Sequence, residues 1–91
     1  MLKIDLSRAS KKFLKRLPPK QGRQIAVKIT ELLKNSRPHD SIKMKGKACD
    51  YHRVDVGEYR VIYQVEANTL KVALVGKRND DQVYKEFKRK L

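Results

Sequence analysis

The sequence predicts an α+β fold in which an N-terminal strand and a helical hairpin precede a twisted antiparallel sheet of three to four strands and a short C-terminal helix. Three observations lead to this prediction. Apolar and polar residues alternate with a period of two near the N-terminus and again over residues 51–65, whereas the apolar residues between these segments recur at helical spacing. The chain has 91 residues without repeats or linkers, so we expect residues 1–91 to form one domain.

The first strand is expected over residues 2–6, where apolar and charged residues alternate. Ser7 can cap the helix that follows. Pro18 and Pro19 end that helix, and Pro19 suits the first turn of a second helix. The two helices should therefore form a hairpin. Their apolar positions are Ala9, Phe13, Leu14, Leu17, Ile25, Ala26, Ile29, Leu32 and Leu33.

The second helix should end before Pro38, because the residue that precedes a proline is biased away from helical geometry. Residues 37–50 lack a clear period and are expected to form a short strand or an extended loop. After the hairpin of residues 51–65, a turn at residues 66–69 leads to an apolar run at residues 72–75. Such a run indicates a central strand that is covered on both faces.

Gly76 follows this run and is expected to mark a bulge or a close backbone approach. Asp80 or Asp81 can cap a last helix. This helix should contain Val83, Tyr84 and Phe87, of which Val83 and Phe87 are the better core candidates.

The hairpin of residues 51–65 turns at Gly57 and Glu58, and it has two distinct faces. Tyr59 and Tyr63 share a face with valines and are expected in the core. An arginine held on a rigid strand is positioned more accurately than one on a loop. We therefore expect a basic functional face on the hairpin. Its candidates are Arg53, Asp55 and Arg60.

The composition points to a polyanionic partner. The chain carries 23 Lys and Arg against 10 Asp and Glu, a net charge of +13, which is the usual electrostatic footprint of nucleic-acid binding. The single cysteine, Cys49, excludes an intramolecular disulfide and fits a reducing compartment. No apolar run is long enough to span a membrane or to serve as a signal peptide, so a cytoplasmic location is expected.

The chemistry available to this chain suits phosphate better than metals or organic cofactors. His39, His52 and Cys49 do not have the spacing of a zinc site, and no dinucleotide or P-loop motif is present, so we expect no metal and no cofactor. RNA supplies its own nucleophile, the 2′-hydroxyl beside each phosphodiester. A protein needs only to align that hydroxyl, remove its proton, stabilise the phosphorane charge and protonate the leaving oxygen.

Two segments, YHRVDVGEYRVIYQVE and VALVGKRNDDQVYKEF, carry a resemblance to a known family. They resemble the RelE family of toxins from bacterial and archaeal toxin–antitoxin systems, and the segment lengths match over essentially the whole chain. The resemblance implies a RelE-like fold and a ribosome-dependent, metal-independent endoribonuclease that cuts mRNA and so inhibits translation. It also implies mRNA, the ribosome with its 16S ribosomal RNA, and an acidic cognate antitoxin as partners.

By position, the resemblance implies roles for four residues. Arg60 is similar to the family's phosphate-stabilising arginine, and Arg78 to a second arginine that supports the transition-state charge or the leaving group. Tyr84 matches a tyrosine that orients or stacks on the substrate, although it could also simply pack its helix on the sheet. Arg53 lies where the family has a lysine or arginine.

Asp55 departs from the family pattern, which commonly has a basic residue at this position. An aspartate could act as the general base, but its ordinary pKa near 4 makes it a weak one. His52 has a better pKa, about 6.5, but strand alternation directs it away from Arg53. The general base therefore stays unassigned. We expect RNA contacts from Lys43, Lys45, Lys47 and His52, while lysines that only blunt an edge strand are the alternative for the first three.

Two other functions fit the same pattern. The first is a ParE-type relative with the same fold that inhibits gyrase and has no nuclease activity. The second is a non-catalytic or weakened RNA-binding homologue, which would explain the +13 charge equally well. The joint presence of Arg60, Arg78 and Tyr84 favours the nuclease.

Overall fold

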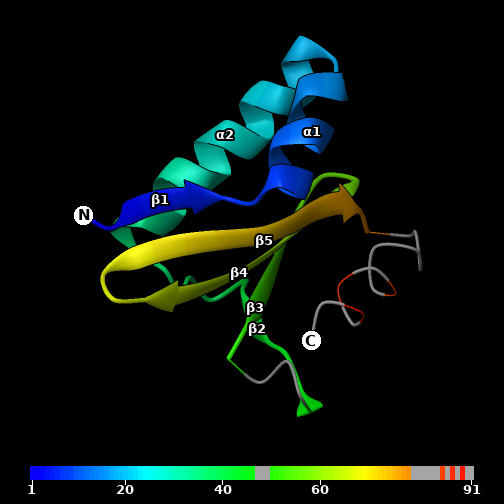
Figure 1. Cartoon of the computed structure of the whole chain (residues 1–91). Helices are drawn as coiled ribbons and strands as arrows, with labels where there is room; N and C mark the ends of the chain where they lie inside the picture. The colour runs from blue at the N-terminus through cyan, green and yellow to red at the C-terminus, as the bar shows by residue number, and fades with distance from the viewer. Residues whose placement is uncertain (47–49, 79–84, 86, 88, 90–91) are drawn as a thin grey trace.

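A computed structural model describes residues 1–46, 50–78, 85, 87 and 89 (Figure 1). Two helices follow the first strand, and four more strands complete the described part of the chain. The elements are β1 (Lys3–Leu6), α1 (Arg8–Arg16), α2 (Pro19–Lys34), β2 (Ile42–Lys43), β3 (His52–Val56), β4 (Tyr59–Glu66) and β5 (Thr69–Lys77).

The described strands form one five-stranded sheet in the order β1-β5-β4-β3-β2. Strands β2 to β5 pair antiparallel, as the sequence predicts, and the α+β fold is confirmed. The structure differs in one respect, because β1 joins the same sheet parallel to β5, with Lys3 opposite Thr69. The sheet is therefore mixed, and β5 lies between two neighbours, as its continuous apolar run indicates.

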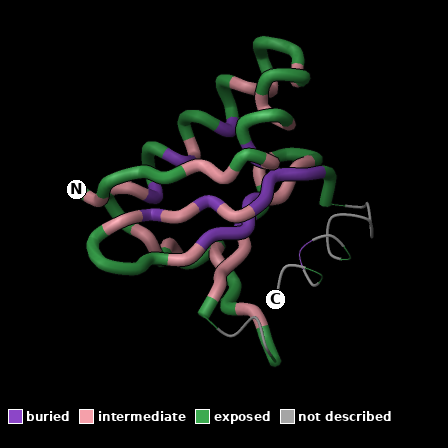
Figure 2. Tube along the Cα trace, viewed as in Figure 1, coloured by how far each residue is buried: buried purple, intermediate pink, exposed green. Residues whose placement is uncertain are grey.

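Helices α1 and α2 cover one face of the sheet (Figure 1), and Phe87 lies against the other. On the helix face, α2 contributes Ile25, Ile29 and Leu32 to a core that includes Val61 and Tyr63. Buried residues accordingly follow β4, β5 and the inner side of α2 (Figure 2). The predicted core position of Tyr63 is confirmed, since this side chain is completely buried.

The opposite face carries a smaller apolar cluster. Ile62 from β4 and Leu74 from β5 are buried there beneath Phe87, which is 2% exposed. Lys85, Phe87 and Arg89 have helical geometry, which agrees with the predicted last helix, whereas Val83 and Tyr84 lie outside the described residues. No helix among the described residues is long and apolar enough to cross a membrane.

Strand β5 contains a bulge that changes which face of the sheet its side chains point to. Ile62 pairs with Leu74, but the next residue, Tyr63, pairs with Val72, so Ala73 is the extra residue. The bulge therefore occurs three residues before Gly76, the position at which the sequence suggested one. Because of this shift, Val72 faces the helices while Leu74 faces Phe87.

The N-terminus of α1 is bonded to this bulge. Ser7 is the N-cap, as predicted, and its Oγ accepts a hydrogen bond from the Ser10 amide at 3.1 Å. The same Oγ donates to the Ala73 carbonyl at 2.7 Å, and the buried Ser10 hydroxyl donates to the Val72 carbonyl at 3.3 Å. One serine thus satisfies both a helix end and a carbonyl of the bulge.

Ser7→Ala is expected to lower the free energy of unfolding by about 2 kcal/mol, because it leaves an orphan amide in α1 and an orphan carbonyl in β5. Urea denaturation measures this change. Thr30→Ala is the matched control, since the Thr30 hydroxyl bonds only the Ala26 carbonyl of its own helix and is exposed, and a change within about 0.5 kcal/mol is expected. Equal losses in the two variants would contradict the proposed link.

Candidate functional site

Two strands and the end of a third bring a carboxylate and arginines together on the sheet face that the helices leave uncovered. Asp55 of β3 and Arg60 of β4 are direct cross-strand partners. The Arg60 guanidinium donates from Nε to Asp55 Oδ1 at 2.7 Å and from Nη2 to Oδ2 at 3.3 Å. Arg78, the residue after β5, places its Nη1 at 4.0 Å from Asp55 Oδ2. We call Arg53, Arg60 and Arg78 the arginine cluster.

The backbone brings Arg78 to this position. Gly76 is the partner of Arg60 on β5, and it puts no side chain beside the arginine. Two residues later, the Arg78 amide donates to the Glu58 carbonyl in the hairpin turn at 2.9 Å. Gly57 makes that turn possible, because its positive φ of 58° is readily adopted only by glycine. The end of β5 is therefore held against the hairpin turn.

Arg53 completes the arginine cluster from β3. It lies two residues before Asp55, on the same side of the strand, and it pairs with Ile62 of β4 and Ile42 of β2. Its positive charge acts on the Asp55 carboxylate together with those of Arg60 and Arg78. The three arginines selected from the sequence therefore surround one carboxylate.

The electrostatics of Asp55 follow from these neighbours. The hydrogen bond from Arg60 is the largest influence and lowers the pKa of the Asp55 carboxyl below its ordinary value of 3.8, with further lowering by the charges of Arg60, Arg53 and Arg78. Partial burial opposes this effect and is outweighed. Asp55 is thus ionised at neutral pH, and a carboxylate with so low a pKa accepts protons weakly, which disfavours it as a general base.

The lowered pKa predicts how stability depends on pH. The stabilisation from ionised Asp55 is fully present above its unfolded-state pKa near 3.8 and is lost as the pH falls through the lower folded pKa. Asp55→Asn should therefore cost up to about 1 kcal/mol at pH 7, the upper range for an exposed pair, and the difference from wild type should narrow as the pH falls below 3.8 and through the lower folded pKa. Urea denaturation at pH 7, 4 and 3 measures it, and a constant difference would contradict the assignment.

An apolar floor adjoins the arginine cluster. The Phe87 ring meets the edge of Tyr51 with centroids 4.9 Å apart and planes at 81°, and it covers Ile62, the partner of Arg53. Gln64 donates from Nε2 to the Tyr51 hydroxyl at 3.2 Å. Sequence reasoning left Tyr51 and Gln64 out of the site, although their alternation with Arg53 and Ile62 put them on this face. Because Ile62 and Phe87 are buried, the half-buried Tyr51 is the aromatic side chain that this region presents beside the cations.

His52 lies on the opposite side of the sheet from the arginine cluster. It is the cross-strand partner of Tyr63, and the two rings stack with centroids 5.8 Å apart and planes at 27°. Burial is the main cause that lowers the pKa of His52, and the charges of Arg37 and Lys43 lower it further. His52 is therefore neutral at pH 7, and the structure does not bring it together with Arg60.

The predicted lysines lie at the β2 end of the sheet. Lys43 and Lys45 line a depression of about 310 Å³ together with Ile42, Met44 and Arg53. Ile42 pairs with Arg53, whereas Lys43 pairs with His52 and so lies on the His52 side of the sheet. Only Ile42–Lys43 pairs as a strand, and the extended segment expected here is confirmed in that short form. Lys47 and Tyr84 lie outside the described residues. Among the described residues, no His, Cys, Asp and Glu side chains gather into a possible metal site.

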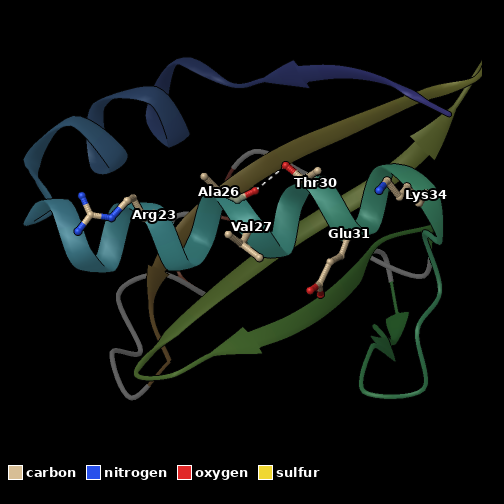
Figure 3. A pocket seen from close by; sticks show the side chains of 6 residues that line it. All are labelled: Arg23, Ala26, Val27, Thr30, Glu31 and Lys34. Atoms are coloured by element: carbon tan, nitrogen blue, oxygen red, sulfur yellow. Dashed lines mark hydrogen bonds between the residues drawn. The ribbon is translucent and has the colours of Figure 1, made fainter.

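A second depression lies on the outer surface of α2, on the helix side of the sheet (Figure 3). It has a volume of about 360 Å³ and is mostly apolar, with Val27 59% exposed. The chain thus exposes apolar surface on one side and the arginine cluster on the other. The depression on α2 is lined by Arg23, Ala26, Val27, Thr30, Glu31 and Lys34.

Comparison with known families identifies the chain. The family model described as "ParE toxin of type II toxin-antitoxin system, parDE" matches residues 4–82, which include the described strands and helices apart from Lys3, the first residue of β1. The chain belongs to this toxin family. It is therefore the toxin component of a type II toxin–antitoxin system of the RelE/ParE superfamily, which confirms the resemblance drawn from the sequence.

Solved structures of RelE toxins have the same fold. The isolated E. coli RelE toxin is 27% identical, with a TM-score of 0.76 and complete coverage of both chains. The toxin in the RelE–RelB complex from Pyrococcus horikoshii is 26% identical, with a TM-score of 0.74, and the match covers 85% of this toxin and 94% of that chain. The RelB–RelE antitoxin–toxin complex from Methanococcus jannaschii gives 28% identity, a TM-score of 0.67 and coverage of 90% and 96%. A search of curated proteins found no match.

Proposed function

We propose that this toxin is a metal-independent endoribonuclease that cuts mRNA on the ribosome in the cytoplasm and so inhibits translation. The observation that carries the proposal is that Arg53, Arg60 and Arg78 all act on one anion on the sheet face opposite α1 and α2. Guanidinium groups match carboxylate and phosphate in the same paired geometry. A site that already holds a carboxylate in this way has the donors that a phosphodiester needs.

In the proposed reaction, the 2′-hydroxyl oxygen of the RNA attacks the adjacent phosphorus. A bond forms between the 2′-oxygen and phosphorus while the bond from phosphorus to the 5′-oxygen breaks. The 2′-hydroxyl gives up its proton to solvent water, the leaving 5′-oxygen takes up a proton from solvent, and the product is a 2′,3′-cyclic phosphate. Arg60, which is more enclosed than Arg78, is assigned to the phosphorane charge. Arg78 is more open and is assigned to the transition-state charge or the leaving oxygen, and Tyr84 to substrate orientation.

The surrounding surface suits a single-stranded RNA. Tyr51 provides an aromatic ring beside the arginine cluster, and Lys43 and Lys45 carry positive charge at the β2 edge of the sheet, where they line a depression with Arg53. Aromatic stacking and a cationic groove together are the usual means of holding single strands. We assign RNA-backbone contacts to Lys43 and Lys45 and propose the same for Lys47. His52 lies on the side of the sheet opposite the arginine cluster and is assigned no step in cleavage.

We further propose an acidic antitoxin as the protein partner. The Pyrococcus and Methanococcus relatives are described in complex with RelB. A chain with a net charge of +13 favours an acidic segment, which would neutralise basic side chains and cover apolar surface.

The alternative is a ParE-type toxin that inhibits gyrase. The observation that favours it is the matching family model itself, which is described as the toxin of parDE. Asp55 adds to this alternative, because it places a negative charge where the proposed nuclease needs to bind phosphate.

The test is to map the 5′ ends of a translated mRNA in a purified translation system with and without the toxin. New 5′ ends confined to codons in the ribosome would support the nuclease. A parallel supercoiling assay with purified gyrase tests the alternative. Inhibited supercoiling without new 5′ ends would overturn the proposed nuclease in favour of the ParE-type function.

A further inference from the structure

Asp55 occupies the face of Arg60 that a phosphate would use. Both of its oxygens accept from one edge of the guanidinium, at 2.7 and 3.3 Å, so the carboxylate takes the paired geometry that two phosphate oxygens would otherwise adopt. The second oxygen also points towards Arg78 at 4.0 Å. One carboxylate therefore engages two of the three arginines assigned to the RNA phosphate.

We propose that Asp55 is an internal competitor for the RNA phosphate, which must displace this carboxylate from Arg60 and Arg78 in order to bind. The inference rests on the proposed function, since it assumes that the arginine cluster receives an RNA phosphate. In this role Asp55 does not act as a general base. Its carboxylate instead sets the affinity of the arginine cluster for RNA.

The exposure of the three side chains makes displacement feasible. Arg60 is 13% exposed and is held in place, whereas Asp55 is 40% and Arg78 46% exposed. Solvent reaches the carboxylate, so the pair is of the exposed class that contributes only about 0–1 kcal/mol. A buried pair would resist exchange because breaking it leaves a desolvated charge. Here the carboxylate can rotate into water while Arg60 keeps its place on the strand.

The charge balance gives the direction of the effect. The arginine cluster holds three positive charges and Asp55 one negative charge. Each of the three arginine charges acts on the Asp55 carboxylate. A phosphate that binds Arg60 lies beside the Asp55 charge, and two like charges 4 Å apart repel by about 1 kcal/mol in water, which corresponds to about a fivefold change in affinity. Removing the charge of Asp55 should therefore strengthen RNA binding by about this factor.

The chain offers a closely matched control. Asp40 is 45% exposed and accepts from Lys28 Nζ at 2.7 Å, so it resembles Asp55 in exposure and in the length of its ion pair. It pairs with α2, on the helix side of the sheet, rather than with the arginine cluster. Asp55→Asn and Asp40→Asn raise the net charge of the toxin by the same amount. Any difference in RNA affinity between the two variants therefore reflects where the charge is removed and not the net charge of the toxin.

The experiment compares the two variants in binding to a fluorescent single-stranded oligonucleotide in which every 2′-hydroxyl is methylated, so that it cannot be cleaved. Anisotropy titrations at fixed salt give the Kd. Asp55→Asn is expected to bind about fivefold more tightly than wild type, and Asp40→Asn less than about twofold. Adding Asp55→Asn to an Arg60→Ala background should give clearly less gain, because the competition takes place on Arg60.

Three results would overturn the inference: equal gains in the two aspartate variants, no gain or a loss in Asp55→Asn, or an undiminished gain without Arg60. Absence of binding by every variant would overturn it as well. Failure of the proposed nuclease is distinguishable, because the probe cannot be cut. A gain in Asp55→Asn with no mRNA cleavage on ribosomes would reject the nuclease alone, whereas cleavage without the gain would reject the competitor role alone.

Discussion

Arg60→Ala is expected to reduce ribosome-dependent mRNA cleavage by at least about 100-fold, the effect of losing one well-placed donor to a developing anion. The folded structure should survive, because Asp55 keeps Arg53 and Arg78 as neighbouring cations and the apolar core on the helix face does not include Arg60. The measurement is the rate at which new 5′ ends appear in a translated mRNA at equal toxin concentrations. Thermal unfolding of the purified variant checks the fold.

Arg23→Ala is the matched control for Arg60→Ala. Arg23 is exposed at the outer depression of α2, so its removal lowers the net charge equally but on the helix side of the sheet. Cleavage by Arg23→Ala should stay within a few-fold of wild type, as expected for a cation that adds only to the general field. If the two arginine variants cut equally well, Arg60 does not stabilise the reacting phosphate.

Phe87→Ala should have the second large effect, lowering the free energy of unfolding by about 3 kcal/mol, as truncation of a buried aromatic does. Phe87 is 2% exposed and packs on Tyr51, Ile62 and Leu74, next to the arginine cluster. Its loss removes the apolar contacts that Phe87 makes with the sheet. Urea denaturation measures the stability, and we expect cleavage to fall as well.

Phe87→Leu separates packing from aromaticity. Leucine keeps most of the buried apolar area, so a loss of no more than about 1.5 kcal/mol and near-normal cleavage are expected. A stability loss in Phe87→Ala below about 1 kcal/mol would show that the C-terminal residues are not anchored through this ring. Cleavage unaffected by either substitution would show that the proposed active face works without them.

The arginine cluster also explains why Asp55 was difficult to interpret from the sequence. A carboxylate at a position where the family commonly has a base suggested either weakened catalysis or a substitute general base. The geometry instead pairs it with Arg60 and lowers its pKa, which makes it an anion held by the cations and a weaker proton acceptor. The same contact is the basis for the competition with RNA phosphate proposed above.

Local patterns in the sequence were sufficient for most of the fold. The capping serine at Ser7, the proline that begins α2 and the alternation in β3 and β4 each act within a few residues, so they can be recognised without a structure. Alternation also put Arg53 and Asp55 on one side of β3, and Arg60 and Ile62 on one side of β4. The family followed from the motifs that these same residues form.

Only the tertiary structure decided which of these faces meet. The parallel pairing of β1 with β5 joins Lys3 to Thr69, a contact that no local pattern specifies. The bulge at Ala73 shifts the faces of β5 by one residue, and it is held by Ser7 from the other end of the chain. The contact between Arg78 and Asp55 likewise depends on β5 ending at the hairpin turn. Periodicity describes one element at a time, whereas register and ion pairing depend on the relative placement of elements distant in sequence.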